Sequence, residues 1–201
     1  MLDGQHRVQG AKVKGYVGKL PAIIYDDLSL EEEAQLFLAL NSSKPVQALD
    51  KFKVEVTAGE AASVAINSIV EDEGFFVGQK AQGARAIGAV GALRDVYRIH
   101  GAKALRLTLR IILAAWDDTP TSATGPRMIK ALGSVVAMPK SEVTGLIDTL
   151  KNTSAASILG EADFIHDMYP NVTKARADVE HICKLYNKGL KKADKIGMVA
   201  A

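Results

Sequence analysis

The sequence predicts an α+β protein that is mainly α-helical, with a small α/β unit over residues 1–55 and an all-α helical domain over residues 56–201. Aromatic residues make up only 5% of the chain and Ala and Gly are abundant, which favours closely packed helices over a β-sandwich. From about Thr57 onwards, apolar residues recur with helical spacing almost without interruption. The short run Ala22–Tyr25 is continuously apolar instead, which is typical of a strand buried on both faces.

The first 55 residues alternate between helical and strand patterns. A helix is predicted from Gln5 to about Tyr16, followed by a strand over Pro21–Tyr25. Ser29 and Glu32 have the spacing of a capping box, so the next helix begins there and ends near Asn41. The one strand that we expect to matter therefore lies between two helices.

The later part of the chain is read as a series of helices. Phe75–Val77 is either a short strand or a buried loop. Two long helices meet at His100-Gly101, where Gly101 is a plausible end cap. Two prolines and several small polar residues make Asp117–Pro126 a loop. The predicted helices are Ala61–Val70, Ala84–Ile99, Ala102–Trp116, Arg127–Val136, Glu142–Lys151, Ala155–Met168 and Val172–Lys192.

Composition narrows the class of protein. The formal net charge of +2 creates no global field that would demand a nucleic-acid partner. Cys183 is the single cysteine, which fits a reducing compartment. Residues Asp3 to Arg7 are polar where a signal peptide would be apolar, and the apolar stretch Leu105–Trp116 is too short and too charged to span a bilayer. We expect a cytoplasmic protein that does not bind membranes.

The most informative stretch is Asp3-Gly4-Gln5-His6-Arg7. Gly4 permits a tight turn, and a turn that opens a helix presents backbone N–H groups to an anion such as phosphate. Arg7 would add a planar fork of donors, and His6 would add a donor whose charge depends on pH near neutrality. The alternative is that Arg7 pairs with Asp3 and that His6 is an ordinary polar residue.

This stretch, followed by Ala11, resembles the DGQHR signature of the ParB/sulfiredoxin-like superfamily, in which the turn lies between a strand and a helix and holds nucleotide phosphates. The resemblance extends over nearly the whole chain. It covers the family's next strand, the helix after it and the region of the Glu-Asn-x-x-Arg box. It also covers the C-terminal end of phage and actinobacterial proteins that are labelled ParB-like nuclease domain proteins. The matching segments are Leu20–Tyr25, Leu30–Asn41, Lys44–Phe52 and Tyr186–Leu190.

The resemblance implies a ParB-like, DNA-associated protein, such as a regulator of phage or plasmid type, that binds a nucleoside triphosphate (CTP or ATP, with magnesium) or DNA phosphate. Leu40 stands where the family's box has an acidic residue, which weighs against nuclease or nucleoside triphosphatase chemistry. Whether the protein is an enzyme is therefore left open, with binding favoured. The implied phosphate-binding residues are Gly4, Gln5, His6 and Arg7, with Asn41, Ser42, Ser43 and Lys44 on the opposite wall.

The superfamily has a strand before the glycine turn, whereas this sequence starts with Met1-Leu2. We therefore expect that this strand is missing or reduced and that the small sheet has an exposed edge. Because exposed sheet edges pair readily with other chains, a homodimer through residues 1–4 or 20–26 is a hypothesis.

Basic residues form two clusters in the helical domain. Lys103, Arg106 and Arg110 share a helix face at i, i+3 and i+7, and Arg94 and Arg98 form a similar pair one helix earlier. This stripe is either a phosphate-binding surface for DNA or a solvated helix face. The second cluster has the same two readings and suits the negative end of the last helix: Lys184, Lys188, Lys191, Lys192 and Lys195.

Spacing gives no support for a metal site or a nucleophile. The four histidines lack zinc-binding spacing, and no Walker loop or Gly-x-Ser-x-Gly motif is present. His181 and Cys183 are two residues apart and would point to different helix faces, so Cys183 is predicted to be a buried, inert thiol. A non-catalytic helical interaction module remains a third hypothesis beside the binding protein and the enzyme.

Overall fold

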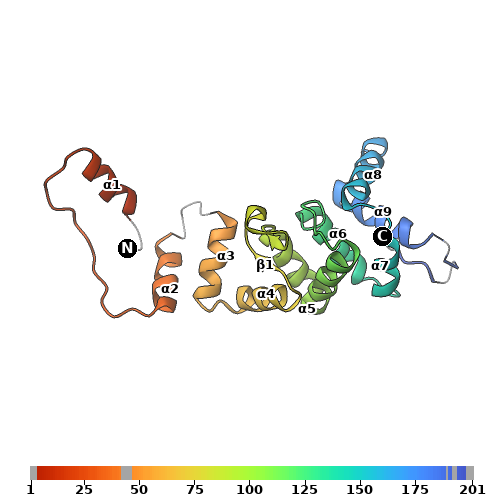
Figure 1. Cartoon of the computed structure of the whole chain (residues 1–201), viewed down its shortest axis with the longest axis horizontal. Coiled ribbons are helices and arrows are strands. Elements are labelled where there is room, and N and C mark those ends of the chain that lie inside the picture. Colours follow the sequence, from red (N-terminus) through yellow and green to blue (C-terminus); the bar gives the residue numbers. More distant parts are fainter. Residues whose placement is uncertain (1–3, 42–46, 189, 192–193, 198–201) are drawn as a thin grey trace. The chain divides into compact units, whose positions relative to one another are not determined.

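The computed structural model describes residues 4–41, 47–188, 190–191 and 194–197. The protein is mainly helical, which confirms the predicted fold class (Figure 1). It divides into two units, residues 1–64 and 65–201. The division expected between residues 55 and 56 lies nine residues earlier, within the helix α3 (Ala48–Thr57).

The first unit contains α1 (Gln5–Val13), α2 (Leu30–Leu40), α3 and the start of α4 (Ala61–Asp72). The predicted capping box at the start of α2 is confirmed. The Oγ atom of Ser29 accepts a hydrogen bond from the Glu32 N–H at 3.2 Å, and the Ser29 N–H donates to Glu32 Oε2 at 2.8 Å. The second of these bonds lowers the pKa of Glu32, so the box is complete at neutral pH.

Among the described residues of the first unit, the buried apolar side chains come from α2, α3 and the turn after α3. Phe52 is fully buried, and Ala34 and Ala58 are at most 9% exposed. The side-chain amide of Gln35 donates to the Ala58 carbonyl at 3.3 Å, which ties α2 to the end of α3. Helix α1 buries none of its residues, so it adds no side chain to this small core.

The prediction of a buried strand over Pro21–Tyr25 is wrong. This segment has no regular secondary structure, and Ile23 and Ile24 are 81% and 78% exposed. A strand buried on both faces needs neighbouring strands, and the described residues of this unit contain none. The expected sheet edge is therefore absent from the described residues, although the apolar side chains that would have filled the sheet remain exposed.

The second unit begins with the rest of α4. Two short parallel strands follow, β1 (Phe76–Val77) and β2 (Ala86–Ile87), connected through a 3-10 turn at Lys80–Gln82. Phe76 pairs with Ala86 in the register of this ladder. Of the two alternatives for Phe75–Val77, the structure therefore supports the strand. Because β2 occupies residues that were predicted to be helical, the following helix begins at Val90 instead of Ala84.

Helix α5 (Val90–Ala115) is broken at Gly101, where φ is 83° and ψ is 172°. This confirms the predicted junction at His100-Gly101. A positive φ is strained for residues with a side chain, so glycine allows two helical segments to meet here without a long loop.

Four further helices complete the second unit: α6 (Pro126–Val136), α7 (Val143–Leu150), α8 (Ala155–Met168) and α9 (Lys174–Tyr186). Helix α6 packs against α5 on one side and against α9 and α8 on the other, and α7 packs on α5 (Figure 1). The core consists of fully buried aliphatic side chains from these helices, including Leu93, Leu105, Leu109, Ile112, Ile129, Leu132, Leu146, Ile158 and Ile182.

Helices α5 and α6 approach closely at Gly133. A Cβ atom on Gly133 would lie 2.6 Å from Val96 Cγ2, so no larger residue fits without movement. The predicted loop over residues 117–126 connects these two helices. It also packs inwards, because Thr119 and Ala123 are fully buried.

An ionic cluster connects α6 to α8 and α9. The Arg127 guanidinium donates to both carboxylate oxygens of Asp178, Nε to Oδ2 at 3.0 Å and Nη2 to Oδ1 at 2.6 Å. It also donates to Asp163 Oδ2 at 3.0 Å, and Lys174 lies 3.4 Å from the same carboxylate. The hydrogen bond from Arg127 lowers the pKa of Asp163. Because Asp178 is only 2% exposed, its charge depends on Arg127 for compensation.

We expect Arg127→Met to lower the free energy of unfolding by about 3–5 kcal/mol, because it leaves the buried Asp178 carboxylate without its cation. Urea unfolding at neutral pH measures this. Lys151→Met is the matched control, because Lys151 pairs with Asp148 on the surface and should cost less than about 1 kcal/mol. Equal small losses for both variants would show that the cluster does not stabilise the helical unit.

Candidate functional site

The start of α1 has the turn that the motif predicts. Gly4 immediately precedes the helix with φ 86°, in the left-handed region that favours glycine. A Cβ atom at this position would lie 3.3 Å from Arg7 Nη2, so the Arg7 guanidinium folds back over the turn. The first-turn N–H groups of a helix attract anions. The Arg7 guanidinium lies at this N-terminal end of α1 and adds a positive charge there. Residues 1–3, including the expected remnant of a first strand, lie outside the described residues.

The end of α1 brings an aromatic ring back to the helix. The Gly15 N–H donates to the Lys12 carbonyl at 3.1 Å and the Tyr16 N–H donates to the Ala11 carbonyl at 2.9 Å. With Gly15 at φ 66°, this is a Schellman motif, in which the chain reverses and its next residue contacts the preceding turn. Tyr16 is thereby held close to Ala11.

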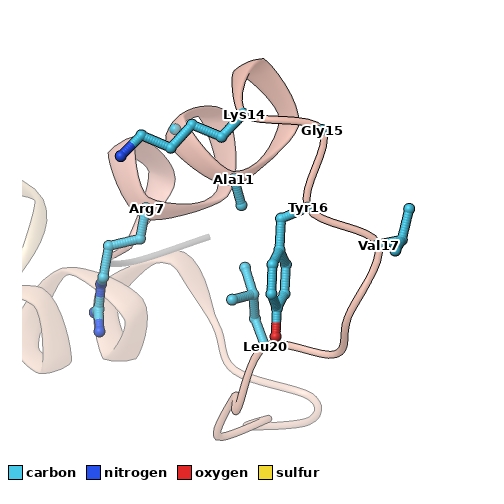
Figure 2. Close-up of a pocket in the computed structure, with 8 residues that line it drawn as sticks. Arg7, Ala11, Lys14, Gly15, Tyr16, Val17 and Leu20 are labelled. Atoms are coloured by element: carbon cyan, nitrogen blue, oxygen red, sulfur yellow. The ribbon is translucent and has the colours of Figure 1, made fainter.

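These two ends of α1 line one open depression of about 710 Å³, within the range of small-molecule sites. Arg7 and Lys14 lie seven residues apart on one face of the helix, and both line the depression. Figure 2 shows Tyr16 and Leu20 side by side near Ala11, with Arg7 and Lys14 extending from the same helix. The site thus combines two cations with an aromatic ring and an apolar surface.

The structure brings only some of the predicted binding residues together. Gly4 and Arg7 lie together at the turn, whereas Gln5 and His6 are exposed in the first helical turn and do not line the depression. The side-chain amide of Asn41 donates to the Phe37 carbonyl at 2.9 Å and so caps the end of α2.

The remaining predicted wall, Ser42, Ser43 and Lys44, falls outside the described residues. Lys14 and Tyr16 were missed by sequence reasoning. The spacing of Lys14 from Arg7 and the Lys14-Gly15-Tyr16 helix end are the signals that could have found them.

A family model matches residues 1–198 of the chain. The chain belongs to the family of unknown function DUF6551. No curated protein and no solved structure matches the chain.

The other groups that could support chemistry do not form a site. Among the described residues, no cluster of three or more His, Cys, Asp or Glu side chains is arranged to hold a metal ion. Cys183 is buried with its sulfur 3.7 Å from Met138 Sδ, and burial raises the pKa of its thiol to about 11. This confirms the prediction of a buried, inert thiol. Burial also lowers the pKa of His181, which keeps this imidazole neutral.

None of the helices in the described part of the chain combines the length and the hydropathy that a membrane crossing requires.

The basic stripe on α5 is partly neutralised. Arg106 donates to Glu73 Oε1 at 3.1 Å and to Asp72 Oδ2 at 3.0 Å, and Arg110 donates to Glu73 Oε2 at 2.7 Å. The Glu73 side chain is 7% exposed, so it needs these cations. Lys103 remains exposed on the same helix.

In the preceding segment of α5, Arg98 lies 3.4 Å from Asp95, which also binds Lys130. Arg94, the remaining residue of the predicted stripe, is half-buried. A role of the stripe in DNA binding stays a prediction, and the carboxylates beside it reduce its net charge.

Replacing Arg106 and Arg110 together with Gln should lower the free energy of unfolding by about 1–3 kcal/mol, because the Glu73 carboxylate loses its charged hydrogen bonds. Chemical denaturation measures the loss. Adding Glu73→Gln to the double variant should restore part of it, since no buried charge then remains. A double variant as stable as the wild type would contradict a structural role for the two arginines.

Proposed function

We propose that this DUF6551 chain is a ParB-like, DNA-associated protein whose first unit binds the phosphates of a nucleotide or of DNA through the Gly4–Arg7 turn and Lys14. The observation that carries the proposal is that Arg7 and Lys14 line the same depression as Tyr16. The lone cysteine is consistent with the cytoplasm as the place where the protein acts.

The residues of the depression suit the parts of a nucleoside triphosphate such as CTP or ATP. Arg7 offers a planar fork of donors and Lys14 a compact charge, and both are common phosphate ligands. The Tyr16 ring, 56% exposed, offers a face on which a base can stack. No carboxylate lines the described depression, so magnesium would enter the site bound to the phosphates of the nucleotide.

The proposal assigns binding rather than hydrolysis to this site. Nuclease or nucleoside triphosphatase activity needs a group that positions water or a metal ion, and Leu40 stands where the resembling family has an acidic residue. Release of inorganic phosphate from CTP or ATP in the presence of magnesium separates these two functions. Sustained turnover would replace the binding proposal with the enzyme alternative.

We expect Arg7→Ala to weaken nucleotide binding by about ten- to a hundredfold, because a charge-assisted hydrogen bond contributes roughly 1.5–3 kcal/mol. Isothermal titration with CTP and ATP, with and without magnesium, measures the loss. Lys12→Ala is the matched control, because Lys12 is an exposed cation of α1 that does not line the depression.

Folding is checked by circular dichroism and thermal melting. Since α1 buries no residue, neither substitution should unfold the helical unit. The proposal fails if no nucleotide binds or shifts the melting of the wild type. It also fails if the Arg7 and Lys12 variants lose the same affinity.

A second candidate function is self-association through the segment 20–25, which the exposed apolar side chains favour. Ile23 and Ile24 are about four-fifths exposed and Tyr25 is half exposed. Burying one isoleucine contributes roughly 1.5–3 kcal/mol, so pairing of two copies would gain several such increments. The partner in this proposal is a second copy of the chain, and a helical interaction module is the broader form of the same idea.

The double variant Ile23→Asp/Ile24→Asp should be monomeric at concentrations at which the wild type is dimeric, because the charges prevent burial of the segment. Light scattering coupled to size-exclusion chromatography measures the mass. Ile99→Asp is the control, because Ile99 is also exposed but lies on α5. A wild type that stays monomeric at high concentration would exclude this association.

A further inference from the structure

The chain after α9 is fixed by a clasp between a side chain and the backbone. The Asn187 side-chain amide donates to the Ile196 carbonyl at 2.6 Å, and the Ile196 N–H donates to Asn187 Oδ1 at 2.8 Å. Ile196 is 4% exposed, so its side chain is anchored in the helical unit. We call the described residues of this stretch, 187–188, 190–191 and 194–196, the C-terminal loop.

Two turns lie inside the C-terminal loop. The Leu190 N–H donates to the Asn187 carbonyl at 3.1 Å, and the Asp194 N–H donates to the Lys191 carbonyl at 3.0 Å. Gly189, Lys192 and Ala193 fall outside the described residues and are not part of the surface considered below. The described loop residues are therefore held at the end of α9 and do not trail away as a free tail.

The clasp presents a concentration of positive charge. Lys188, Lys191 and Lys195 of the loop are exposed, as is Lys184 in the last turn of α9. Asp194 is the only carboxylate in the described loop. Within the described part of the chain, none of these four lysines forms an ion pair, and Asp194 pairs with none of them.

Several other basic residues of the helical unit differ in this respect, although Lys103 does not. Lys130 and Lys151 each bind a nearby carboxylate, and Arg106 and Arg110 share Glu73. Each of these carboxylates reduces the positive charge that an external anion would experience. The C-terminal loop thus keeps charge that the α5 stripe loses to its own carboxylates.

We propose that the C-terminal loop, together with Lys184, binds the phosphate backbone of duplex DNA. Lysine ammonium groups bind phosphates as point charges and release counterions when they do so. Tyr186 is 8% exposed, so the loop offers no described ring on which an unpaired base could stack, which favours duplex over single-stranded DNA. Leu190 is the one large apolar side chain exposed in the described loop, which is little for insertion into a membrane.

This surface belongs to the second unit and does not depend on the nucleotide site proposed for the first. Contacts to phosphate position a protein on DNA without reading its sequence. The proposal is therefore a sequence-independent DNA contact.

The test is the salt dependence of binding to a fluorescent duplex of about 20 base pairs, followed by anisotropy between about 50 and 200 mM salt. Each lysine that neutralises a phosphate adds about 0.9 to the slope of log affinity against log salt. The triple variant Lys188→Gln, Lys191→Gln and Lys195→Gln should therefore reduce the slope by about 2.7. The corresponding triple variant with Arg at these positions should keep the slope, because it keeps the charge.

The matched control is the triple variant Lys51→Gln, Lys130→Gln and Lys151→Gln, which removes the same charge from exposed lysines that pair with carboxylates. It should change the slope by less than about one. Equal reductions in the two triple variants would overturn the proposal in favour of a general charge effect. If replacing Arg106 and Arg110 reduced the salt slope instead, the DNA-binding surface would lie on α5 and the proposal would be wrong.

Two further results would also overturn the proposal. The first is a wild type that does not bind the duplex at the lowest salt concentration. The second is a wild type that binds vesicles containing phosphatidylserine more tightly than it binds the duplex. The triple variant with Gln at Lys188, Lys191 and Lys195 should bind CTP and ATP as tightly as the wild type, because none of these lysines lines the depression. Failure of the nucleotide site and failure of the DNA surface are therefore distinguishable.

Discussion

The close contact between α5 and α6 is the constraint on which the rest of the helical unit depends. At Gly133 the two helices approach until a methyl group would collide with Val96, so their buried faces meet directly. Helix α6 carries this contact on one side and reaches α8 and α9 on the other through Arg127. A sequence with few aromatic residues builds its core in this way, because small and aliphatic side chains fill the space between helices that lie close together.

Sequence reasoning located the helices well where the signal is local. The capping box at Ser29 and the helix break at Gly101 depend on neighbouring residues, and the structure confirms both. It failed at Ala22–Tyr25, because an apolar run shows only that burial would be favourable and does not show that neighbouring strands exist. The strand alternative for Phe75–Val77 was correct, but β2 was missed, because it forms by pairing with β1 and not by a pattern of its own.

The candidate sites show the same division between local and distant signals. The turn at Gly4 was predicted because its conformation is a property of glycine, and the missed Schellman motif at Gly15 is equally local. The stripe on α5 was read correctly as sharing one face, but the pairing of Arg106 with Glu73 joins positions 33 residues apart. Helical periodicity cannot show which acidic residues will lie opposite a row of cations. That information came only from the tertiary structure.

The burial of Cys183 has a practical consequence for spectroscopy on this chain. With a pKa of about 11, on the order of one thiol in ten thousand is ionised at pH 7, and it is the thiolate that attacks maleimides and similar reagents. A cysteine introduced on the surface would therefore react far faster than the native one. Single-site attachment of fluorophores or spin labels should be achievable in the otherwise unaltered protein, without first removing a residue that is packed against Met138.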